Sequence, residues 1–246
     1  MESYRFQHVS FTYPEGTKPA LTDISFSVSG GEFLILCGPS GCGKSTLLRH
    51  LKTCLTPHGI FCGEILFEGV PLGQVSVRDQ AQKIGYVLQS PDNQVVTDKV
   101  WHELAFGLES LGYDTPTIRR RVAEIAAFFG IESWFYKNVN ELSGGQKQLL
   151  SLASVMAMQP SVLVLDEPTA QLDPIAAADF LALLGKINRE LGTTIILTEH
   201  RLEEAFPFAT RVIVMEKGNI LCDETPERVG LHLKDKGSGM FLAMPT

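Results

Sequence analysis

The chain has 246 residues, 44% of them hydrophobic, and a formal net charge of −7. This length and apolar content suffice for one large core, or for a core with a small inserted subdomain. The acidic charge disfavours a protein that binds nucleic acid mainly by electrostatics, because phosphate binding requires a basic face, and we expect no nucleic-acid partner. The tight basic cluster at residues 119–121 lies beside Val122, Ile125 and Phe129, a pattern typical of the solvated face of an amphipathic helix.

The apolar runs and the cysteine spacing indicate how the chain relates to membranes and in which redox state its thiols are. No apolar run approaches the length of about 20 residues that a bilayer span requires, and residues 1–10 lack the basic and apolar regions of a signal peptide. Any membrane role is therefore expected to come through a partner. The cysteines are Cys37, Cys42, Cys54, Cys62 and Cys222. Their spacing indicates neither a zinc site nor a disulfide framework, and predicts reduced thiols.

Short β-rich runs alternate with helical ones, which predicts an α/β fold with a parallel sheet. The expected core strands are residues 33–37, 84–88, 162–165, 195–198 and 212–215. Most are continuously apolar, as expected when both faces of a sheet are covered. Near the start, Ile24, Phe26 and Val28 alternate with polar residues, which predicts an antiparallel strand with one solvated face. Residues 63–69 are expected in the same small β-subdomain.

Apolar periodicity predicts three helices. The first begins at a glycine-rich turn and carries Leu47, Leu48, Leu51 and Leu55; the second carries Leu149, Leu152, Ala153, Met156 and Ala157 and ends before Pro160; the third opens with Pro174 and carries Phe180, Leu183, Leu184, Ile187 and Leu191. Between about residues 97 and 139 the sequence is helical in period and lacks strands.

We therefore expect a single domain with a helical insert. The nucleotide-binding core and its β-subdomain would occupy residues 1–89 and 160–230. The helical subdomain would occupy residues 90–159, and residues 231–246 would form a short C-terminal tail.

A glycine-rich motif follows the apolar run 33–37 and precedes a predicted helix. Its residues are Gly38, Pro39, Ser40, Gly41, Cys42, Gly43, Lys44 and Ser45, followed by Thr46. This spacing is the P-loop pattern, in which backbone N–H groups at a helix N-terminus bind phosphate oxygens. We expect Lys44 to bind the β- and γ-phosphates of ATP and the Ser45 hydroxyl to ligate Mg²⁺. The alternative is an ordinary glycine-rich turn.

Two acidic residues follow the apolar run 162–165. In open α/β sheets, ligands bind at the carboxyl ends of the strands. Asp166 is expected to hold Mg²⁺ through water, and Glu167 to act as general base on the attacking water. The alternative is that these carboxylates cap the next helix.

A third motif consists of Leu142, Ser143, Gly144, Gly145 and Gln146. Ser143 is placed to cap a helix, and the glycines leave amides free to contact an anion. Because the P-loop supplies its own anion site, we expect this helix end to face the γ-phosphate bound by a second chain.

With this motif the sequence resembles the ABC ATPases, whose defining signature is LSGGQ. The resemblance covers about residues 3–230. It implies a P-loop NTPase (RecA-like) core with an N-terminal antiparallel β-subdomain and an inserted α-helical subdomain. It also implies that each ATP is held in a dimer, between the P-loop of one subunit and the signature of the other.

Four further positions match this family in order and context, and the resemblance implies their roles. Gln89 corresponds to the Gln that reaches Mg²⁺ and the attacking water. Asp173 lies in a segment that resembles the D-loop, which crosses the dimer interface. His200 stands where the family has the His that contacts the γ-phosphate, and Tyr13 where it has the aromatic that stacks on adenine. A surface His and a core Tyr are the alternatives.

The resemblance narrows at residues 89–94 and 105–108, which look like the ATPases of energy-coupling-factor transporters and related cobalt and nickel importers. Arg201, in place of the Asp common after that His, points the same way. In that family the region after the Gln forms a groove for helices of a transmembrane coupling subunit. Asp92 and Asn93 are then candidate contacts, with a surface turn as the alternative.

The resemblance also implies the partners and the location of the chain. The partners would be a second ABC ATPase subunit, the transmembrane coupling subunit that docks near residues 89–94, and a substrate-binding membrane subunit. Through them the chain would lie at the cytoplasmic face of the membrane.

Two features depart from the family pattern. Leu149 stands where many ABC ATPases carry Arg, so a polar contact is not expected there. The chain ends soon after Met240, where many energy-coupling ATPases have a longer extension that helps to hold the dimer. We therefore expect pairing without nucleotide to be weak or to depend on the membrane partner.

Other functions fit less well. A soluble ABC ATPase of DNA repair or translation is the alternative, although such proteins usually carry long coiled-coil insertions or two fused ATPase domains. A P-loop kinase would leave residues 142–146 unexplained. Within transport, a generic ABC importer or exporter is the close rival to the energy-coupling type.

Overall fold

The central sheet is built from the apolar strands predicted in the middle and later parts of the chain. The computed structural model describes residues 1–235. The sheet has six strands in the order β10-β9-β3-β8-β7-β6, and its neighbours are parallel except for the antiparallel pair β9 and β10. The strands are β3 Phe33–Cys37, β6 Ile84–Val87, β7 Val162–Asp166, β8 Thr194–Thr198, β9 Arg211–Glu216 and β10 Asn219–Glu224.

Each strand of this sheet contributes alternate residues to two cores, one on each face. In β3, Phe33 and Ile35 belong to one core and Leu34 and Leu36 to the other. Coverage of both faces explains why these runs are continuously apolar, and the five predicted core strands are confirmed. Strand β10 was not predicted, because its apolar run is only three residues long, Ile220 to Cys222, and is flanked by polar residues.

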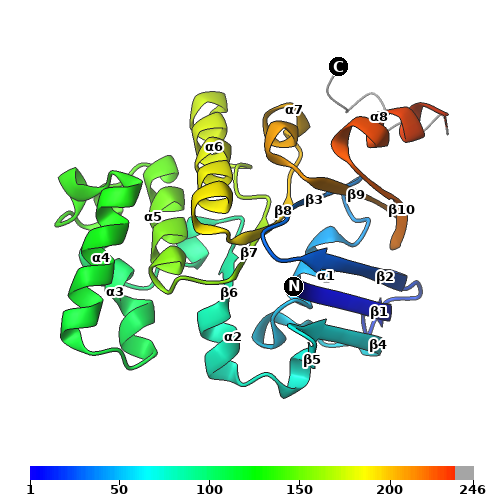
Figure 1. The fold of residues 1–246 in the computed structure, drawn as a ribbon, viewed down its shortest axis with the longest axis horizontal. Coiled ribbons are helices and arrows are strands. Elements are labelled where there is room, and N and C mark those ends of the chain that lie inside the picture. The colour runs from blue at the N-terminus through cyan, green and yellow to red at the C-terminus, as the bar shows by residue number, and fades with distance from the viewer. Residues whose placement is uncertain (236–246) are drawn as a thin grey trace.

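A second, antiparallel sheet covers one face of the central sheet (Figure 1). Its order is β2-β1-β4-β5. The strands are β1 Glu2–Thr12, β2 Leu21–Ser29, β4 Ile60–Phe67 and β5 Val70–Pro71. The alternation predicted around Ile24, Phe26 and Val28 is that of β2, and residues 63–69 overlap β4. The predicted antiparallel β-subdomain is confirmed.

The helices lie on both faces of the central sheet: Leu47 and Leu48 of the first helix belong to the core shared with the antiparallel sheet, whereas most of the later helices pack against the other face. They are α1 Lys44–Arg49, α2 Val77–Lys83, α3 Val100–Ser110, α4 Thr115–Phe129, α5 Gly144–Ala157, α6 Pro174–Leu191, α7 Leu202–Ala205 and α8 Pro226–Asp235. Figure 1 shows α3, α4 and α5 grouped together, with α6 between them and the strands. Their buried residues share one core with β3, β7 and β8. A helical insert between β6 and β7 is thus confirmed, whereas the exact domain division stays a prediction, and its tail from residue 236 on lies outside the described residues.

The first predicted helix is shorter than expected. It was predicted to carry Leu51 and Leu55, but α1 ends at Arg49, and Leu55 lies in a 3₁₀ turn, Thr53–Leu55. The reason is tertiary: the Thr53 N–H donates to the side-chain oxygen of Gln80 at 3.0 Å. That hydrogen bond replaces the one that a continuing helix would make.

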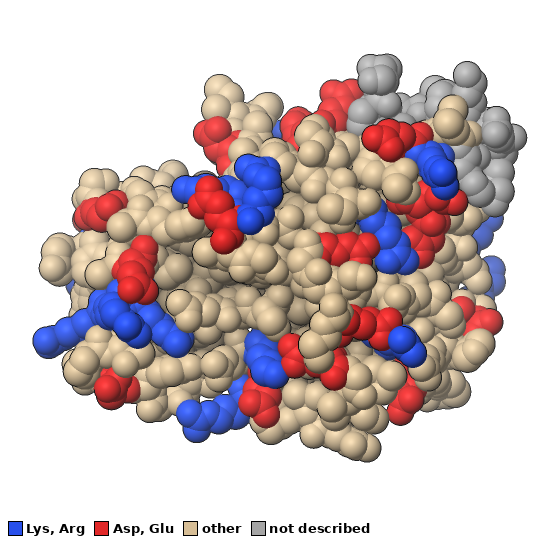
Figure 2. Space-filling model, viewed as in Figure 1, with Lys and Arg blue, Asp and Glu red and all other residues tan. Residues whose placement is uncertain are grey.

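Charges of both signs are mixed over the surface. In Figure 2, Lys and Arg side chains alternate with Asp and Glu across the face shown, and the largest basic group lies over the helical part. Arg119 and Arg120 project from α4 into solvent, as predicted, while Arg121 stacks over the Tyr113 ring at 4.5 Å. Within residues 1–235, no helix has both the length and the apolar character needed to cross a bilayer.

Candidate nucleotide-binding site

The P-loop connects β3 to α1 through backbone conformations that require glycine. Gly38 has a φ of 149°, and a Cβ there would lie 2.2 Å from the carbonyl oxygen of Met215. Gly43 has a φ of 108°, and a Cβ there would lie 2.5 Å from the carbonyl oxygen of Ala20. A side chain at either position would push the loop away from its neighbours.

The loop forms the floor of a cavity of about 410 Å³. The cavity is lined by Tyr13, Ala20, Ser40, Gly41, Gly43, Lys44, Ser45, Thr46 and Glu167. Lys44 is 5% exposed, and its ammonium group donates to the carbonyl oxygens of Gly38 at 2.8 Å and Pro39 at 3.3 Å. These acceptors are uncharged, so a phosphate oxygen can replace them with a stronger, charge-assisted bond. The cavity therefore fits the phosphates of a nucleotide.

Of the three predicted Mg²⁺ ligands, Ser45 of α1 and Asp166 of β7 are in contact, whereas Gln89 contacts Glu167. The Ser45 hydroxyl donates to Asp166 Oδ1 at 2.9 Å, and the Thr198 hydroxyl donates to the same oxygen at 2.9 Å. Asp166 is only 8% exposed. Hydroxyl and carboxylate oxygens are the donors that Mg²⁺ prefers in nucleotide sites, so these residues fit the ion.

Glu167 turns away from Asp166 through an unusual backbone conformation. Its φ is 47°, a left-handed value that is rare for non-glycine residues and concentrates at functional sites. The Glu167 N–H donates to the Thr198 hydroxyl at 2.9 Å and to the Thr198 carbonyl at 3.1 Å. These two bonds hold the strained residue in place. The adjacent carboxylates consequently have separate partners.

The predicted base, glutamine and histidine form one hydrogen-bonded group. Glu167 Oε1 lies 2.8 Å from His200 Nε2, and Gln89 Nε2 donates to Glu167 Oε2 at 3.1 Å. The side chain of Glu167 is 20% exposed and that of His200 is 50% exposed. Gln89 follows β6, Glu167 follows β7 and His200 follows β8, so three neighbouring strands deliver these groups to one edge of the sheet.

Tyr13 lines the same cavity as the P-loop and Glu167. Its hydroxyl hydrogen-bonds to the Thr46 hydroxyl at 3.0 Å, and its ring packs edge-on against Phe11. The side chain remains 37% exposed. The ring is thus anchored to the P-loop helix and still open to solvent, as a stacking platform requires.

Burial keeps the thiols of this region protonated at neutral pH. Burial raises the pKa of Cys37, at the end of β3, to about 12. It also raises the pKa of Cys42 within the P-loop, an effect that the nearby Lys44 ammonium opposes. A neutral thiol in the loop adds no negative charge against phosphate.

The signature motif lies apart from this cavity. Ser143 caps α5: its hydroxyl accepts from the Gln146 N–H at 3.3 Å, and the Gln146 side chain accepts from the Ser143 N–H at 2.9 Å. Ser143 and Gly144 are exposed. In Figure 1, α5 stands in the helical group and α1 beside the strands. The structure therefore does not bring the predicted signature residues to the P-loop of the same chain.

Asp173 acts as a helix cap in this structure. Its carboxylate accepts from the N–H groups of Ile175 and Ala176 at 3.0 and 2.9 Å, at the start of α6. Its predicted nucleotide role stays a prediction.

Thr198 and Glu199 contact the site, although sequence reasoning did not single them out. Thr198 binds both Asp166 and Glu167, and Glu199 is 3% exposed. The available signal was their place at the end of a core strand, directly before His200 and beside the strand of Asp166.

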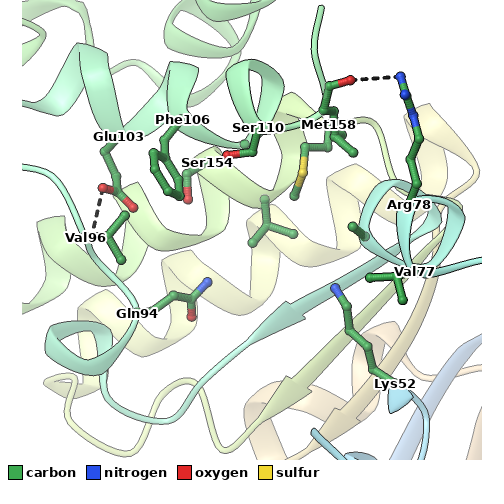
Figure 3. Close-up of a pocket in the computed structure, with 14 residues that line it drawn as sticks. Lys52, Val77, Arg78, Gln94, Val96, Glu103, Phe106, Ser110, Ser154 and Met158 are labelled. Atoms are coloured by element: carbon green, nitrogen blue, oxygen red, sulfur yellow. Dashed lines mark hydrogen bonds between the residues drawn. The ribbon is translucent and has the colours of Figure 1, made fainter. Parts of the chain in front are cut away.

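A larger groove of about 540 Å³ lies between α2 and α3 (Figure 3). Val77 and Arg78 form one side, Glu103, Phe106 and Ser110 form the other, and Gln94 and Val96 lie at the end near Glu103. Val77, Val96 and Phe106 are exposed apolar residues. The groove adjoins the predicted docking segment, residues 89–94, because Gln94 is one of its lining residues.

The docking segment itself is a 3₁₀ turn, Pro91–Asn93. Asp92 and Asn93 are exposed. Asp92 Oδ1 accepts from the Lys147 ammonium of α5 at 2.7 Å. Gln148, also of α5, donates to the Leu88 carbonyl at 3.5 Å. The turn is thus joined to the signature helix.

Comparison with known proteins places these features in a family. The sequence matches the ABC transporter family over residues 21–170. A relative from Bacillus cereus, provisionally named an ABC transporter ATP-binding protein, is 52% identical over 222 residues, which are 90% of this chain and 40% of the relative. A relative from Methanosarcina acetivorans with the same description is 40% identical over 217 residues, 87% of this chain and 34% of the relative. The chain thus spans about two fifths or less of the length of these relatives.

Solved structures give the same result. The cbiO1 protein from Clostridium perfringens, described as part of the ABC transporter complex cbiONQ, is similar with a TM-score of 0.82 and 31% identity, covering 96% of this chain and 98% of that one. A dimeric ATP-binding cassette in a post-hydrolysis state with ADP and phosphate has a TM-score of 0.78 and 27% identity, covering 90% of this chain and 98% of its own.

These matches agree with the geometry of the site. They confirm the predicted P-loop NTPase fold, and they confirm an ATPase domain that uses ATP with Mg²⁺. The chain belongs to the ABC transporter family.

Proposed function

We propose that this chain is the ATP-hydrolysing subunit of a membrane transporter of the energy-coupling-factor importer type. One ATP would be held between the P-loop of one such domain and Ser143, Gly144, Gly145 and Gln146 of a second. The observation that carries the proposal is the hydrogen-bonded group of Gln89, Glu167 and His200. It stands beside a phosphate-sized cavity in a chain whose signature is exposed elsewhere.

The residues of the chain divide the work of hydrolysis. Lys44 and the P-loop amides bind the triphosphate, and Tyr13 stacks on the base. Ser45, Asp166 and Gln89 would hold Mg²⁺, which when bound neutralises phosphate charge. Glu167 accepts a proton from the water whose oxygen attacks the γ-phosphorus, while the bond to the β–γ bridging oxygen breaks and ADP leaves.

His200 and Gln89 orient the base. Both side chains bind the Glu167 carboxylate, at 2.8 and 3.1 Å, so the carboxylate is fixed before water arrives. His200 also has an exposed edge with which to contact the γ-phosphate. A preorganised base of this kind contributes on the order of 10²–10⁴ in rate.

The coupling to transport is assigned to the groove between α2 and α3. Its exposed apolar side chains, Val77, Val96 and Phe106, suit a helix of a transmembrane coupling subunit. The similarity to cbiO1 supports this type of complex, because that protein is part of cbiONQ. Closure of two domains on shared ATP would bring two grooves together, and hydrolysis would release them.

In this scheme the partners are a second ATPase subunit, a coupling subunit at residues 89–94 and a substrate-binding membrane subunit. They would place the chain at the cytoplasmic face of the membrane. The division into a core (1–89 and 160–230) and a helical subdomain (90–159) would then place the P-loop in the core and the signature in the helical subdomain, with the groove between them lined by residues of both.

Co-purification from solubilised membranes tests the proposal. The tagged chain should bring down a small transmembrane coupling protein and a substrate-binding membrane protein, both identified by mass spectrometry. Phe106→Asp should abolish this association, because it places a charge in the apolar groove. Ile60→Asp is the matched control, since Ile60 is exposed on β4, outside the groove.

Two results would count against it. Recovery of repair or translation factors without integral membrane proteins would favour the alternative function of a soluble ABC ATPase. Equal loss of membrane proteins in Phe106→Asp and Ile60→Asp would show that the groove is not the docking site.

A further inference from the structure

A buried carboxylate lies directly before His200. Glu199 is 3% exposed and accepts three hydrogen bonds. The Thr169 hydroxyl donates to Oε2 at 2.6 Å, and the N–H groups of His200 and Arg201 donate to Oε1 at 2.8 and 3.1 Å. A buried charge is costly unless it is hydrogen-bonded, so these donors are a condition for its presence.

These bonds join two loops that are distant in sequence. Residues 199–201 follow β8, and residues 167–172 follow β7. Besides the contact of Glu199 with Thr169, the Arg201 guanidinium donates to the Leu172 carbonyl at 2.9 Å. His200 binds Glu167 in the same stretch. The two loops are therefore connected along their whole length.

We propose that Glu199, assisted by Arg201, is a positioning residue for hydrolysis. It fixes the backbone of His200 relative to the loop that carries Glu167, so that the imidazole is held against the base. The proposal rests on the proposed function, because it assumes that Glu167 and His200 act together. Glu199 does not line the nucleotide cavity, so it acts through His200 and not on the substrate.

The geometry favours this role over simple burial. Oε1 binds the backbone N–H of the very residue whose ring contacts Glu167. Oε2 binds the loop that leads from Glu167 toward α6. A shift of the His200 backbone by about 1 Å is sufficient to cost about 10²-fold in rate. Loss of Glu199 removes a hydrogen bond from each loop at once.

Arg201 gives the departure at this position a physical meaning. Arg201 stands directly after His200, where the wider family commonly has Asp. An Asp side chain is too short to span to the Leu172 carbonyl and has no N–H to donate. The arginine therefore adds a hydrogen bond between the loops to those of Glu199 with Thr169 and of His200 with Glu167.

The test compares two buried carboxylates by steady-state ATP hydrolysis. Glu199→Ala should lower kcat by about 10²-fold and leave KM for ATP unchanged. Glu199→Gln should recover most of the rate, because its carbonyl oxygen keeps both backbone bonds and its NH₂ group can donate to the Thr169 hydroxyl.

Glu32→Ala is the matched control. Glu32 is 11% exposed at its side chain, accepts from the Ser29 N–H at 2.7 Å, and pairs with Arg211 outside the cavity. The Glu32→Ala variant should have a lower Tm than the wild type without a comparable loss of kcat. Wild-type kcat in Glu199→Ala, or an equal loss in Glu32→Ala, would overturn the proposal.

Two further variants keep the test decisive. If Glu199→Ala does not fold, Thr169→Val removes one hydroxyl and should lower kcat by about tenfold, the equivalent of one lost hydrogen bond; unchanged kcat would overturn the proposal. Glu167→Gln separates the two hypotheses, because normal turnover by that variant would remove the base from the proposed function whatever Glu199→Ala does. In the Glu167→Gln background, loss of Glu199 should cost little more, since both act through one group.

Discussion

The two ends of the proposed ATP site differ in how far one chain completes them. At the P-loop edge, strands β6, β7 and β8 deliver Gln89, Glu167 and His200 into direct contact. At the start of α5, Ser143 makes only the local bonds of a capping box and faces solvent. The first region is assembled within the chain, and the second is presented outward.

This difference separates chemistry from assembly. The proposed catalytic groups are already hydrogen-bonded to one another within one chain. The signature offers free amides at Gly144 and Gly145, where a Cβ at Gly144 would meet nothing within 4 Å. We infer that a second domain supplies what this end needs, and that variants of the two ends should fail in different ways.

The largest effect is expected at the assembled end, with Glu167→Gln. The substitution keeps the shape of the side chain and its contacts with Gln89 and His200, but the amide cannot accept a proton. Hydrolysis should fall by about 10²- to 10⁴-fold, while ATP binding persists. The ATP-bound dimer should then accumulate, as measured by light scattering after size exclusion.

The control is the same measurement with ADP, which should leave the variant unpaired. Wild-type turnover by Glu167→Gln in the assembled transporter would show that another group is the base. A monomeric variant in saturating ATP would argue against a nucleotide shared between domains.

Lys44→Ala should impair the same region of the site, but at ATP binding and not at hydrolysis. The ammonium group donates to two uncharged carbonyl oxygens, which a phosphate oxygen can replace. Loss of a charge-assisted hydrogen bond of about 1.5–3 kcal/mol predicts an affinity for ATP about 10- to 100-fold lower. Isothermal titration would check this; an unchanged Kd would contradict the P-loop assignment.

Ser143→Ala tests the outward end. Loss of the cap should lower the free energy of unfolding by about 1 kcal/mol, which urea denaturation can measure. ATP affinity of the single domain should not change, because Ser143 does not line the cavity. ATP turnover by the paired domains should fall in the Ser143→Ala variant. A domain that hydrolyses ATP at full rate without Ser143 would refute the shared site.

The sequence predicted the assembled end better than the connections around it. Motif spacing predicted that Lys44 begins a helix after a core strand and that Asp166 and Glu167 lie at the end of another, and the structure has them there, because a P-loop and the end of a core strand fix local geometry. It could not show that the Thr198 hydroxyl reaches Asp166, or that Glu199 binds Thr169. Such contacts depend on which strands become neighbours, and strand order is a property of the whole fold.

The errors have the same cause. Helix α1 ends early because Gln80, 27 residues away, takes the Thr53 N–H. Strand β10 was missed because it lies at the edge of the sheet, paired only with β9, and its apolar run is short. Periodicity reports the surroundings of a segment but not its hydrogen-bond partners.

The smallest effect is expected for the ion pair of Lys147 with Asp92, which joins the signature helix to the turn that follows Gln89. Lys147 belongs to the signature helix and Asp92 to the predicted docking turn, with their charged atoms 2.7 Å apart. Asp92 is 67% exposed at its side chain, so the pair should contribute only about 0.2–1 kcal/mol to stability. Lys147→Glu should cost about that much in urea denaturation, and the charge-reversed double variant with Asp92→Lys should restore it.

This pair can distinguish a structural link from a docking contact. If Asp92 also contacts the coupling subunit, the double variant should regain stability but not membrane association, because the partner then meets a charge of the opposite sign. Recovery of both properties would assign Asp92 to the link alone. Recovery of neither would mean that the ion pair does not join the turn to α5, and that the outward end moves independently of the docking segment.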